Sequence, residues 1–324
     1  MAYAIRAVRP GGSEVLERVD FEPEAPGTGE IRVRHGAIGV NFIDIYIRTG
    51  SYPWPVKENL VLGCEAAGVV DAVGDGVAGF AEGDRVAYVL ANGAYSTHRN
   101  INVSHVVHLP DHIDDRTAAA CMLKGLTCYY LLHDSFRVEA GHKVLFHAAA
   151  GGVGLIAGQW LAAKGATAIG TAGSDSKCEL ALGNGYTDVI NYNTGDFVAG
   201  VRSITEGGMA DVVYDSVGAG TWPGSRDCLR RHGTLVAFGQ SSGPVEGFGF
   251  ADLAVGSLHL TRPTLFHFVS DRGWLESASA ALFDMIGSGR IQITVNQTYP
   301  LAEAGRAHEA LEGRETTGCT LLLP

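Results

Sequence analysis

A short run of small residues between two apolar segments has the composition of a phosphate-binding turn. The turn Ala149-Ala150-Gly151-Gly152-Val153-Gly154 follows an apolar run at 143–147 and leads into a helical pattern that continues to Ala163. An apolar run of this length predicts a buried parallel strand. Gly151 would let backbone approach a pyrophosphate closely, Gly154 would let the helix pack on the strand, and the helix N–H groups would face the phosphates. The order of strand, turn and helix therefore predicts a dinucleotide site whose first fingerprint glycine is replaced by alanine.

The end of the following strand decides which dinucleotide fits. NAD-specific sites carry an Asp or Glu ~20 residues after the glycines to bind the ribose 2′-hydroxyl, but the corresponding residue here is Gly173. An uncharged strand end leaves space for a phosphate, to which Lys177 can supply charge and Ser174 a hydroxyl. These residues favour NADPH, although Asp175 weakens the case. The alternative is that Ser174 or Asp175 caps the helix and Lys177 is a solvated surface residue.

The segment that contains this turn is predicted to alternate between strands and helices. Between Lys143 and Leu260 the sequence predicts parallel strands joined by helical crossovers, which implies a doubly wound sheet with ligands at the carboxyl ends of its strands. Those ends are expected at 148–154, 171–174, Tyr192, 215–218 and 238–241. Helices are expected at 152–164, after Ser174, at 197–205 and at 222–229, and a last strand at 257–263 closes the sheet.

The residues before Pro110 predict a different architecture. Segments that alternate apolar and polar residues between Gly, Pro and Asp turns favour a mostly antiparallel barrel or sandwich. A short helix is expected from Asn41, and helices at 118–122 and 125–132 lead into the dinucleotide domain. After Pro263 the pattern predicts too few elements for a third domain, so they are expected to complete the first one. They are a helix at 274–286, a strand at 291–301, a helix at 303–311 and a strand at 319–324.

Composition excludes several classes of protein. The chain has 324 residues, 46% hydrophobic and 18% charged, which is typical of a globular protein with two domains. Its net charge is −11 without a Lys/Arg cluster, which argues against nucleic-acid and membrane partners. The six cysteines, at 64, 121, 128, 178, 228 and 319, form no C-x-x-C pair and indicate free thiols in a reducing compartment. Because no apolar signal segment or run of ~18 apolar residues is present, we expect a cytoplasmic protein.

Further motifs accompany the Gly-rich turn. They are Gly39-Val-Asn-Phe-Ile-Asp44, Arg48-Thr-Gly-Ser-Tyr52-Pro53, Gly63-Cys-Glu-Ala-Ala-Gly68, Gly93-Ala-Tyr95, Lys124-Gly-Leu-Thr127 and Tyr214-Asp-Ser-Val-Gly218. With them the chain resembles, over almost its whole length, the zinc-independent medium-chain dehydrogenases/reductases of the NADPH:quinone oxidoreductase (zeta-crystallin-like) family. The resemblance implies an α/β protein with a GroES-like β-rich catalytic domain at 1–124, completed by 265–324, and a Rossmann NADPH-binding domain at 125–264. The cofactor would lie in the cleft between the domains.

The zinc-bearing members of that superfamily provide a contrast. They carry a cysteine at the position of Asn41, a histidine at the position of Cys64 and a four-cysteine lobe, none of which is present here. Zinc prefers several deprotonated sulfur or nitrogen ligands, so no metal is expected and Cys64 is interpreted as a small buried residue. A quinone is a strong acceptor that needs no Lewis acid, so orientation against the nicotinamide would supply most of the rate. No obligatory general acid is expected, because a reduced quinone oxygen can take protons from water.

The resemblance also implies site residues. Asn41 and Tyr46, with Tyr52 as a third candidate, are the predicted catalytic residues because they lie where zinc would be bound, and the first two would also contact the nicotinamide. A buried aromatic role is the alternative for Tyr46, and a surface ion pair is the alternative for Arg314. The other predicted cofactor contacts are Thr127, Ala150, Gly151, Gly152, Val153, Gly173, Ser174, Lys177, Tyr192, Ser216, Val217, Phe238, Gly239, Ser241, Phe266 and Arg314.

The predicted activity is reduction of a quinone by NADPH. Two alternatives are an NADPH-dependent reductase of α,β-unsaturated ketones and a non-catalytic NADPH-binding protein similar to the lens crystallins. Both acceptor types are flat conjugated carbonyl compounds, so the sequence separates them poorly. A homodimer is expected, because the apolar strand at 257–261 would be an exposed sheet edge unless it paired across a twofold axis.

Overall fold

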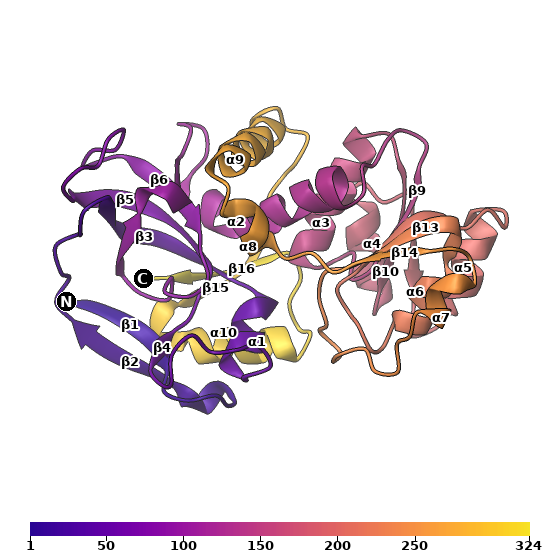
Figure 1. Ribbon diagram of the computed structural model, residues 1–324, viewed down its shortest axis with the longest axis horizontal. Coiled ribbons are helices and arrows are strands. Elements are labelled where there is room, and N and C mark those ends of the chain that lie inside the picture. The colour runs from indigo at the N-terminus through magenta and orange to yellow at the C-terminus, as the bar shows by residue number, and fades with distance from the viewer. The chain divides into compact units, whose positions relative to one another are not determined.

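The computed structural model describes residues 1–324, which form two compact units (Figure 1). The first unit comprises Met1–Leu126, Phe268–Gly287 and Ile293–Pro324, and the second comprises Thr127–His267 and Ser288–Gln292. The division therefore falls within helix α2, Asp115–Tyr130. The domain boundaries predicted at 124/125 and 264/265 stay predictions.

Antiparallel strands dominate the first unit. Their bounds are β1 (Ala2–Ala7), β2 (Leu16–Phe21), β3 (Glu30–Val40), β4 (Leu60–Val61), β5 (Glu65–Val73), β6 (Arg85–Val89), β7 (His98–Asn102), β8 (Val106–His108), β15 (Val295–Pro300) and β16 (Cys319–Leu323). One sheet has the order β2-β1-β4, and the other has the order β15-β16-β3-β5-β6-β8 with β7 also paired to β3. β16 pairs antiparallel with the end of β3, so the C-terminal segment contributes an interior strand to this unit.

The helices of the first unit correct one expectation, and a strand corrects another. They are α1 (Phe42–Arg48), α9 (Arg272–Gly287), α10 (Ala304–Glu312) and the first part of α2, with single turns η1 (Ser13–Val15), η2 (Val103–His105) and η4 (Leu301–Glu303). Instead of two helices at 118–122 and 125–132, α2 is continuous and ends in the π-helical turn η3 (Leu131–Ser135). A Cβ on Gly125 would lie 2.5 Å from the Leu282 side chain, so this glycine admits α9 rather than ending the helix. The strand expected at 291–301 begins only at Val295.

The second unit contains a six-stranded parallel sheet. Its strands are β9 (Lys143–Phe146), β10 (Thr167–Ala172), β11 (Asp188–Asn191), β12 (Ala210–Asp215), β13 (Leu229–Ala237) and β14 (His259–Thr261). The order β11-β10-β9-β12-β13-β14 reverses direction between β9 and β12, and every pairing is parallel. This topology confirms the predicted doubly wound Rossmann sheet, in which ligands bind at the strand ends beside the reversal.

Helices follow the first four strands in chain order as predicted, with one correction, and the two short helices near the end of this unit were not predicted. They are α3 (Gly152–Ala163), α4 (Asp175–Leu182), α5 (Phe197–Ile204), α6 (Trp222–Asp227), α7 (Ala251–Ala254) and α8 (Leu265–Val269). The helix expected to reach Leu229 ends at Asp227, and Leu229 begins β13. Burial explains the change, because Leu229 packs into an apolar core with Leu145 and Val213.

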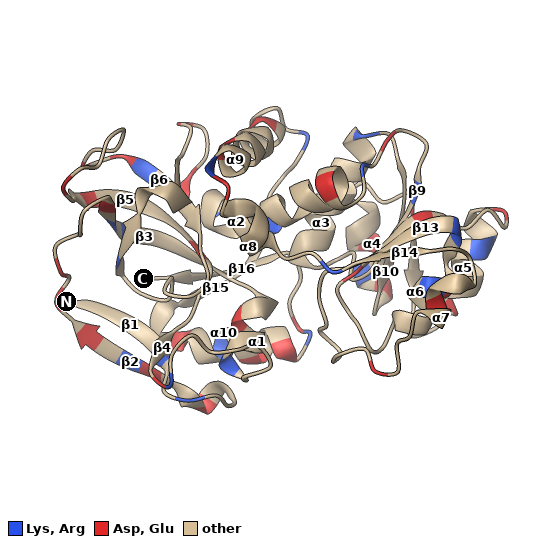
Figure 2. Cartoon of the chain, in the orientation of Figure 1, with Lys and Arg blue, Asp and Glu red and all other residues tan.

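The charged residues form no basic stripe. Figure 2 shows Lys and Arg intermixed with Asp and Glu over the elements of each unit. All six cysteines are buried free thiols, which agrees with the absence of paired spacing in the sequence. None of the helices has the length and apolar character that crossing a membrane requires.

Candidate functional site

The Gly-rich turn lies at the carboxyl end of β9, beside the reversal of strand order. Gly151 is the N-cap residue of α3. A Cβ on Gly154 would lie 2.4 Å from the carbonyl oxygen of Ala148, so only glycine allows the helix to approach the strand end this closely. A Cβ on Gly151 would meet only that same oxygen, at 3.2 Å. The room left at Gly151, together with the unpaired N–H groups of the first turn of α3, fits a pyrophosphate.

The alanine in place of the first fingerprint glycine carries no backbone strain. The left-handed residue of the turn is Ala148, with φ of +55°, whereas Ala149 does not have a positive φ. Ala149 is fully buried, and its N–H donates to the Thr171 carbonyl at 2.9 Å. The turn is therefore fastened to the end of β10.

The end of β10 brings together several predicted contacts. Ser174 is the N-cap residue of α4, and its Oγ accepts from the Lys177 N–H at 3.3 Å, so the capping role weighed for Ser174 is present. A Cβ on Gly173 would lie 2.7 Å from the Tyr192 hydroxyl. Tyr192 therefore covers Gly173 from the end of β11, with 39% of its surface exposed. An uncharged strand end of this kind fits a 2′-phosphate.

The ends of β12 and β13 bring together a second group of predicted contacts. The Ser241 N–H donates to the Ser216 carbonyl at 3.1 Å, and the Phe238 N–H donates to the Asp215 carbonyl at 2.8 Å. A Cβ on Gly239 would lie 2.7 Å from the Ser216 carbonyl oxygen. Ser216, Phe238, Gly239 and Ser241 therefore line adjoining strand ends, as predicted from the topology.

A buried polar network supports these strand ends, and sequence reasoning missed it. Asp215 Oδ1 accepts from the N–H groups of Val217 and Gly218 at 2.7 and 3.1 Å. Asp215 Oδ2 accepts from the Thr221 and Ser225 hydroxyls at 2.7 and 2.6 Å. The carboxylate thus fixes the loop that carries two predicted cofactor contacts.

His147 extends this network to a third strand. Its Nε2 lies 3.0 Å from Ser225 Oγ and its Nδ1 lies 2.8 Å from Thr171 Oγ1. Because Ser225 donates its proton to Asp215, the His147 Nε2–H must donate to Ser225, and Nδ1 accepts from Thr171. Burial lowers the pKa of His147, consistent with this neutral tautomer. The signal in the sequence was a His and an Asp directly after apolar strands.

The remaining predicted contacts are distributed over both units. Thr127 is buried in α2, where the adjacent Cys128 donates its S–H to the Val153 carbonyl at 3.4 Å. Phe266 is half-buried in α8. Arg314 follows α10 in the first unit, with φ of +58°. The two halves of the predicted site thus belong to different units, and their assembly stays a prediction.

In the first unit, α1 and the residues that flank it include the predicted catalytic residues. Asn41 is its N-cap residue and is buried, and its Nδ2 donates to Glu65 Oε1 at 2.8 Å. The Tyr46 and Tyr52 rings pack with centroids 5.2 Å apart and planes tilted by 42°, and Phe42 packs on Tyr46 at 6.1 Å. The structure therefore brings Tyr46 and Tyr52 into contact and sets Asn41 at the start of the helix that carries Tyr46.

A buried ion pair that was not predicted from the sequence holds Asn41. Lys124 Nζ donates to Glu65 Oε1 at 2.9 Å, and the Leu123 N–H donates to Oε2 at 2.6 Å. Both side chains are almost fully buried. Burial is the largest single influence on the pKa of Lys124 and lowers it, but the attraction of Glu65, Cys319 and Asp44 together with the Glu65 hydrogen bond outweighs burial, and the pKa is raised. A lone lysine within the apolar run of α2 was the available signal.

A second buried chain of hydrogen bonds links α1 to α10. The Tyr95 hydroxyl donates to Asp44 Oδ2 at 3.0 Å and lies 2.8 Å from His308 Nε2. His308 Nδ1 accepts from Arg48 Nη1 at 3.2 Å, and Arg48 Nη2 donates to both carboxylate oxygens of Glu312 at 2.7 and 2.9 Å. Burial lowers the pKa of His308 to about 3 and raises that of Asp44 to about 7. His308 is therefore neutral, with its proton on Nε2.

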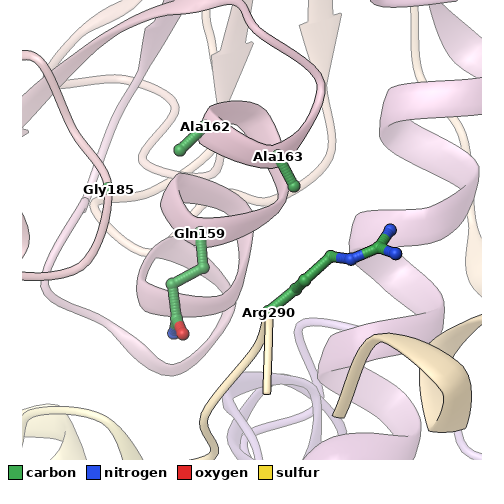
Figure 3. A pocket seen from close by; sticks show the side chains of 5 residues that line it. All are labelled: Gln159, Ala162, Ala163, Gly185 and Arg290. Carbon is green, nitrogen blue, oxygen red and sulfur yellow. The ribbon is translucent and has the colours of Figure 1, made fainter. Parts of the chain in front are cut away.

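A shallow hollow in the second unit lies away from these residues. It is lined by Gln159, Ala162, Ala163, Gly185 and Arg290 (Figure 3). The two alanines are at the C-terminal end of α3, about 15 Å along the helix from the Gly-rich turn. The Gln159 side chain bonds the backbone of Gln292 at 3.1 and 2.7 Å, so this face anchors the 288–292 segment. We assign the hollow no part in the site.

Two family models match the chain: the alcohol dehydrogenase GroES-like domain at residues 27–111 and the zinc-binding dehydrogenase at residues 152–278. The quinone oxidoreductase of Salmonella typhimurium is 49% identical, with all of both chains covered. The crystal structure of Escherichia coli quinone oxidoreductase complexed with NADPH matches with a TM-score of 0.97 and 49% identity over 99% of this chain and 100% of that one. The chain belongs to the quinone oxidoreductase family. A 2-haloacrylate reductase of Burkholderia is 43% identical over 100% of this chain and 99% of its own length.

One of the matching family models is described as a zinc-binding dehydrogenase. In this chain the residues around α1 do not fit a zinc ion. No group of three His, Cys, Asp or Glu side chains is arranged to hold a metal ion. Asn41 offers an amide where a thiolate would be needed, and burial, with Asp44 nearby, raises the pKa of the Cys64 thiol well above its usual value. Glu65 is already occupied by Lys124 and Asn41. Zinc needs deprotonated ligands that are free to coordinate it.

Proposed function

We propose that this chain is an NADPH-dependent quinone reductase that passes reducing equivalents to a quinone without a metal. The observation that carries the proposal is the full-length match to a quinone oxidoreductase solved with NADPH. The first turn of α3, with Gly151, Gly152 and Val153, would hold the pyrophosphate. Lys177 and Tyr192 would hold the 2′-phosphate beside Gly173. When bound, NADPH supplies the reducing equivalents.

The substrate is proposed to lie against α1. Tyr46 and Tyr52 present adjoining aromatic rings that suit a flat conjugated acceptor. Asn41 would contact substrate or nicotinamide, with its amide oriented by Glu65 and Lys124. Thr127, Phe266 and Arg314 are proposed as further cofactor contacts. Because a quinone is easily reduced, holding it and the nicotinamide in orientation would supply most of the rate.

The proposal is tested by following NADPH absorbance with purified protein and 1,4-benzoquinone. We expect rapid loss of the reduced-nicotinamide signal, with the same rate after exhaustive chelation because no metal takes part. No oxidation with any acceptor would leave a non-catalytic NADPH-binding protein as the better description. An enone tested in parallel provides the comparison between acceptors.

A second candidate function is reduction of α,β-unsaturated carbonyl compounds. The relative that favours it is the 2-haloacrylate reductase, at 43% identity over the full chain. The fold, the cofactor and the absence of a fitting metal site are common to both candidates. A strong preference for the enone in the assay above would promote this candidate over quinone reduction.

We also propose a cytoplasmic homodimer formed through the Rossmann sheet. β14 is an edge strand, and an unpaired edge is a liability that twofold pairing removes. Phe250 and Val255, just before this strand, are 88% and 69% exposed. We expect gel filtration to give about twice the mass of one chain, whereas elution at the mass of one chain would contradict the dimer. Six buried free thiols suit a reducing compartment.

A further inference from the structure

An acidic residue lies beside the proposed 2′-phosphate site, where a negative charge is unfavourable. Asp175 is the first residue of α4, between Gly173 and Lys177, and it is exposed. A carboxylate here repels a phosphate and competes with it for the positive end of the helix. The structure shows a partner for this carboxylate, because Asn191 Nδ2 donates to Asp175 Oδ1 at 2.7 Å.

The orientation of the Asn191 amide follows from its other contact. Asn191 Oδ1 accepts from the Asn193 N–H at 3.1 Å, so the NH₂ group must be the end that faces Asp175. Parallel pairing of β10 with β11 sets Asn191 opposite Ala172, at the level of the strand end. The contact joins residues 16 positions apart in the sequence.

The rest of this segment closes over the same strand end. Asn193 Nδ2 donates to the Gly173 carbonyl at 2.7 Å. The Tyr192 hydroxyl occupies the space that a Cβ at position 173 would need, at 2.7 Å. An acid of the NAD-binding type therefore cannot be accommodated at position 173 unless Tyr192 moves. The acid that the chain does carry, Asp175, is tied to β11 instead.

We propose that Asn191 determines specificity: by holding the Asp175 carboxylate against the end of β11, it lets a dinucleotide with a 2′-phosphate bind beside an acidic residue. The inference rests on the proposed use of NADPH and names a residue that sets its selectivity. Without the amide, the carboxylate is released to rotate on the first turn of α4. The pair is exposed to water, so the effect is a few-fold change in affinity.

The test compares two soluble probes that differ in the 2′-phosphate. Affinities for 2′,5′-ADP and 5′-AMP are measured by calorimetry on the full chain, as wild type, Asn191→Leu, Asp175→Asn and the double variant. Asn191→Leu keeps the shape of the side chain. We expect it to lower the affinity for 2′,5′-ADP about three- to fivefold and to leave the affinity for 5′-AMP unchanged. In the Asp175→Asn background the same substitution is expected to have no effect, because no carboxylate remains to be released. Asn191→Asp, which adds a second acid, is expected to weaken 2′,5′-ADP further.

Matched controls separate charge and folding from specificity. Asn184→Leu removes an amide bonded to the Leu180 carbonyl at 2.8 Å, near the other end of α4, and Glu179→Gln removes an acid one turn along the helix. Both are expected to leave the ratio of the two affinities unchanged. Equal loss of 2′,5′-ADP in both Asp175 backgrounds, or equal loss of both probes, would overturn the inference. A wild type that binds the two probes equally would instead contradict the use of NADPH itself.

Discussion

Ala148 stores strain in the turn that follows β9. Its φ of +55° is a left-handed conformation that costs an alanine roughly 1–2 kcal/mol relative to its usual conformations. Glycine adopts it freely but loses more entropy on folding. We expect Ala148→Gly to raise the free energy of unfolding by about 0.5–1 kcal/mol, measured by urea denaturation. Ala149→Gly, at a neighbouring residue without positive φ, is the matched control and should be destabilising; a loss of stability in Ala148→Gly would contradict the account.

At the scale of residues, the sequence predicts the roles of residues within one segment. It does not predict side-chain contacts between segments that are distant in the sequence. The close packing of helix on strand at Gly154 could be predicted from the spacing of the glycines alone. Nothing in an alanine signals a left-handed φ, so the conformation of Ala148 could not be predicted. The pairs Asp175–Asn191 and Glu65–Lys124 join positions 16 and 59 residues apart, and only the pairing of strands and the packing of α2 bring them into contact.

At the scale of elements, Asp215 is expected to hold the end of β12 in its binding geometry. Asp215→Asn replaces one acceptor oxygen with a donor that cannot satisfy the Thr221 and Ser225 hydroxyls. We expect a loss of about 2–3 kcal/mol in the free energy of unfolding and a severalfold higher KM for NADPH, because the loop at 216–218 is released. Thermal unfolding and steady-state kinetics measure the two effects.

A matched control lies at the other end of the same strand. Asp211 accepts from the Lys143 N–H at 2.7 Å and from Arg230 at 2.6 Å, close to the start of β12. Asp211→Asn should therefore lower stability without changing the KM for NADPH. If both variants raise KM alike, Asp215 has no special role at the strand end.

The periodicity of apolar residues predicted most helices and strands, because the pattern for each element lies within one short segment of the sequence. The order of strands in the second unit follows from the alternation of strand and helix, since crossovers of one hand leave few topologies. The prediction divided α2 into helices at 118–122 and 125–132, whereas the structure has one continuous helix in which Gly125 leaves room for the Leu282 side chain of α9. The sequence pattern predicted that a helix extends to Leu229. In the structure this residue begins β13, because its side chain is buried in the apolar core of the second unit.

At the scale of the whole molecule, buried neutral histidines should make the protein sensitive to acid. Burial lowers the pKa of His35 and of His308 to about 3 from 6.5. The unfolded chain therefore binds more protons between pH 6.5 and 3, and this stability is fully present above pH 6.5 and is lost as pH falls. Asp44 acts in the opposite direction, because its pKa is raised to about 7 and its contribution is lost as pH rises towards that value.

The acid sensitivity is tested with His308→Gln, which can still accept from Arg48 and donate to Tyr95. Over the window from pH 6.5 towards 3, we expect the slope of unfolding free energy against pH to fall by up to about 1.4 kcal/mol per pH unit relative to wild type. Urea denaturation at intervals from pH 8 to 5 covers the accessible part. An unchanged slope would mean that His308 is protonated in the folded protein.

The position of β16 has a consequence for the order in which the chain is made. This strand lies between β15 and β3 in the sheet of the first unit, yet its residues leave the ribosome after all of the second unit. The second unit can close its parallel sheet during synthesis, because all six of its strands precede residue 262. Over the same interval the edge of β3 that later pairs with β16, at residues 38–40, is open, although residues 38 and 39 pair with β5 on the opposite edge. An open edge is prone to pair with other chains, so the nascent first unit is the part of this molecule most exposed to aggregation.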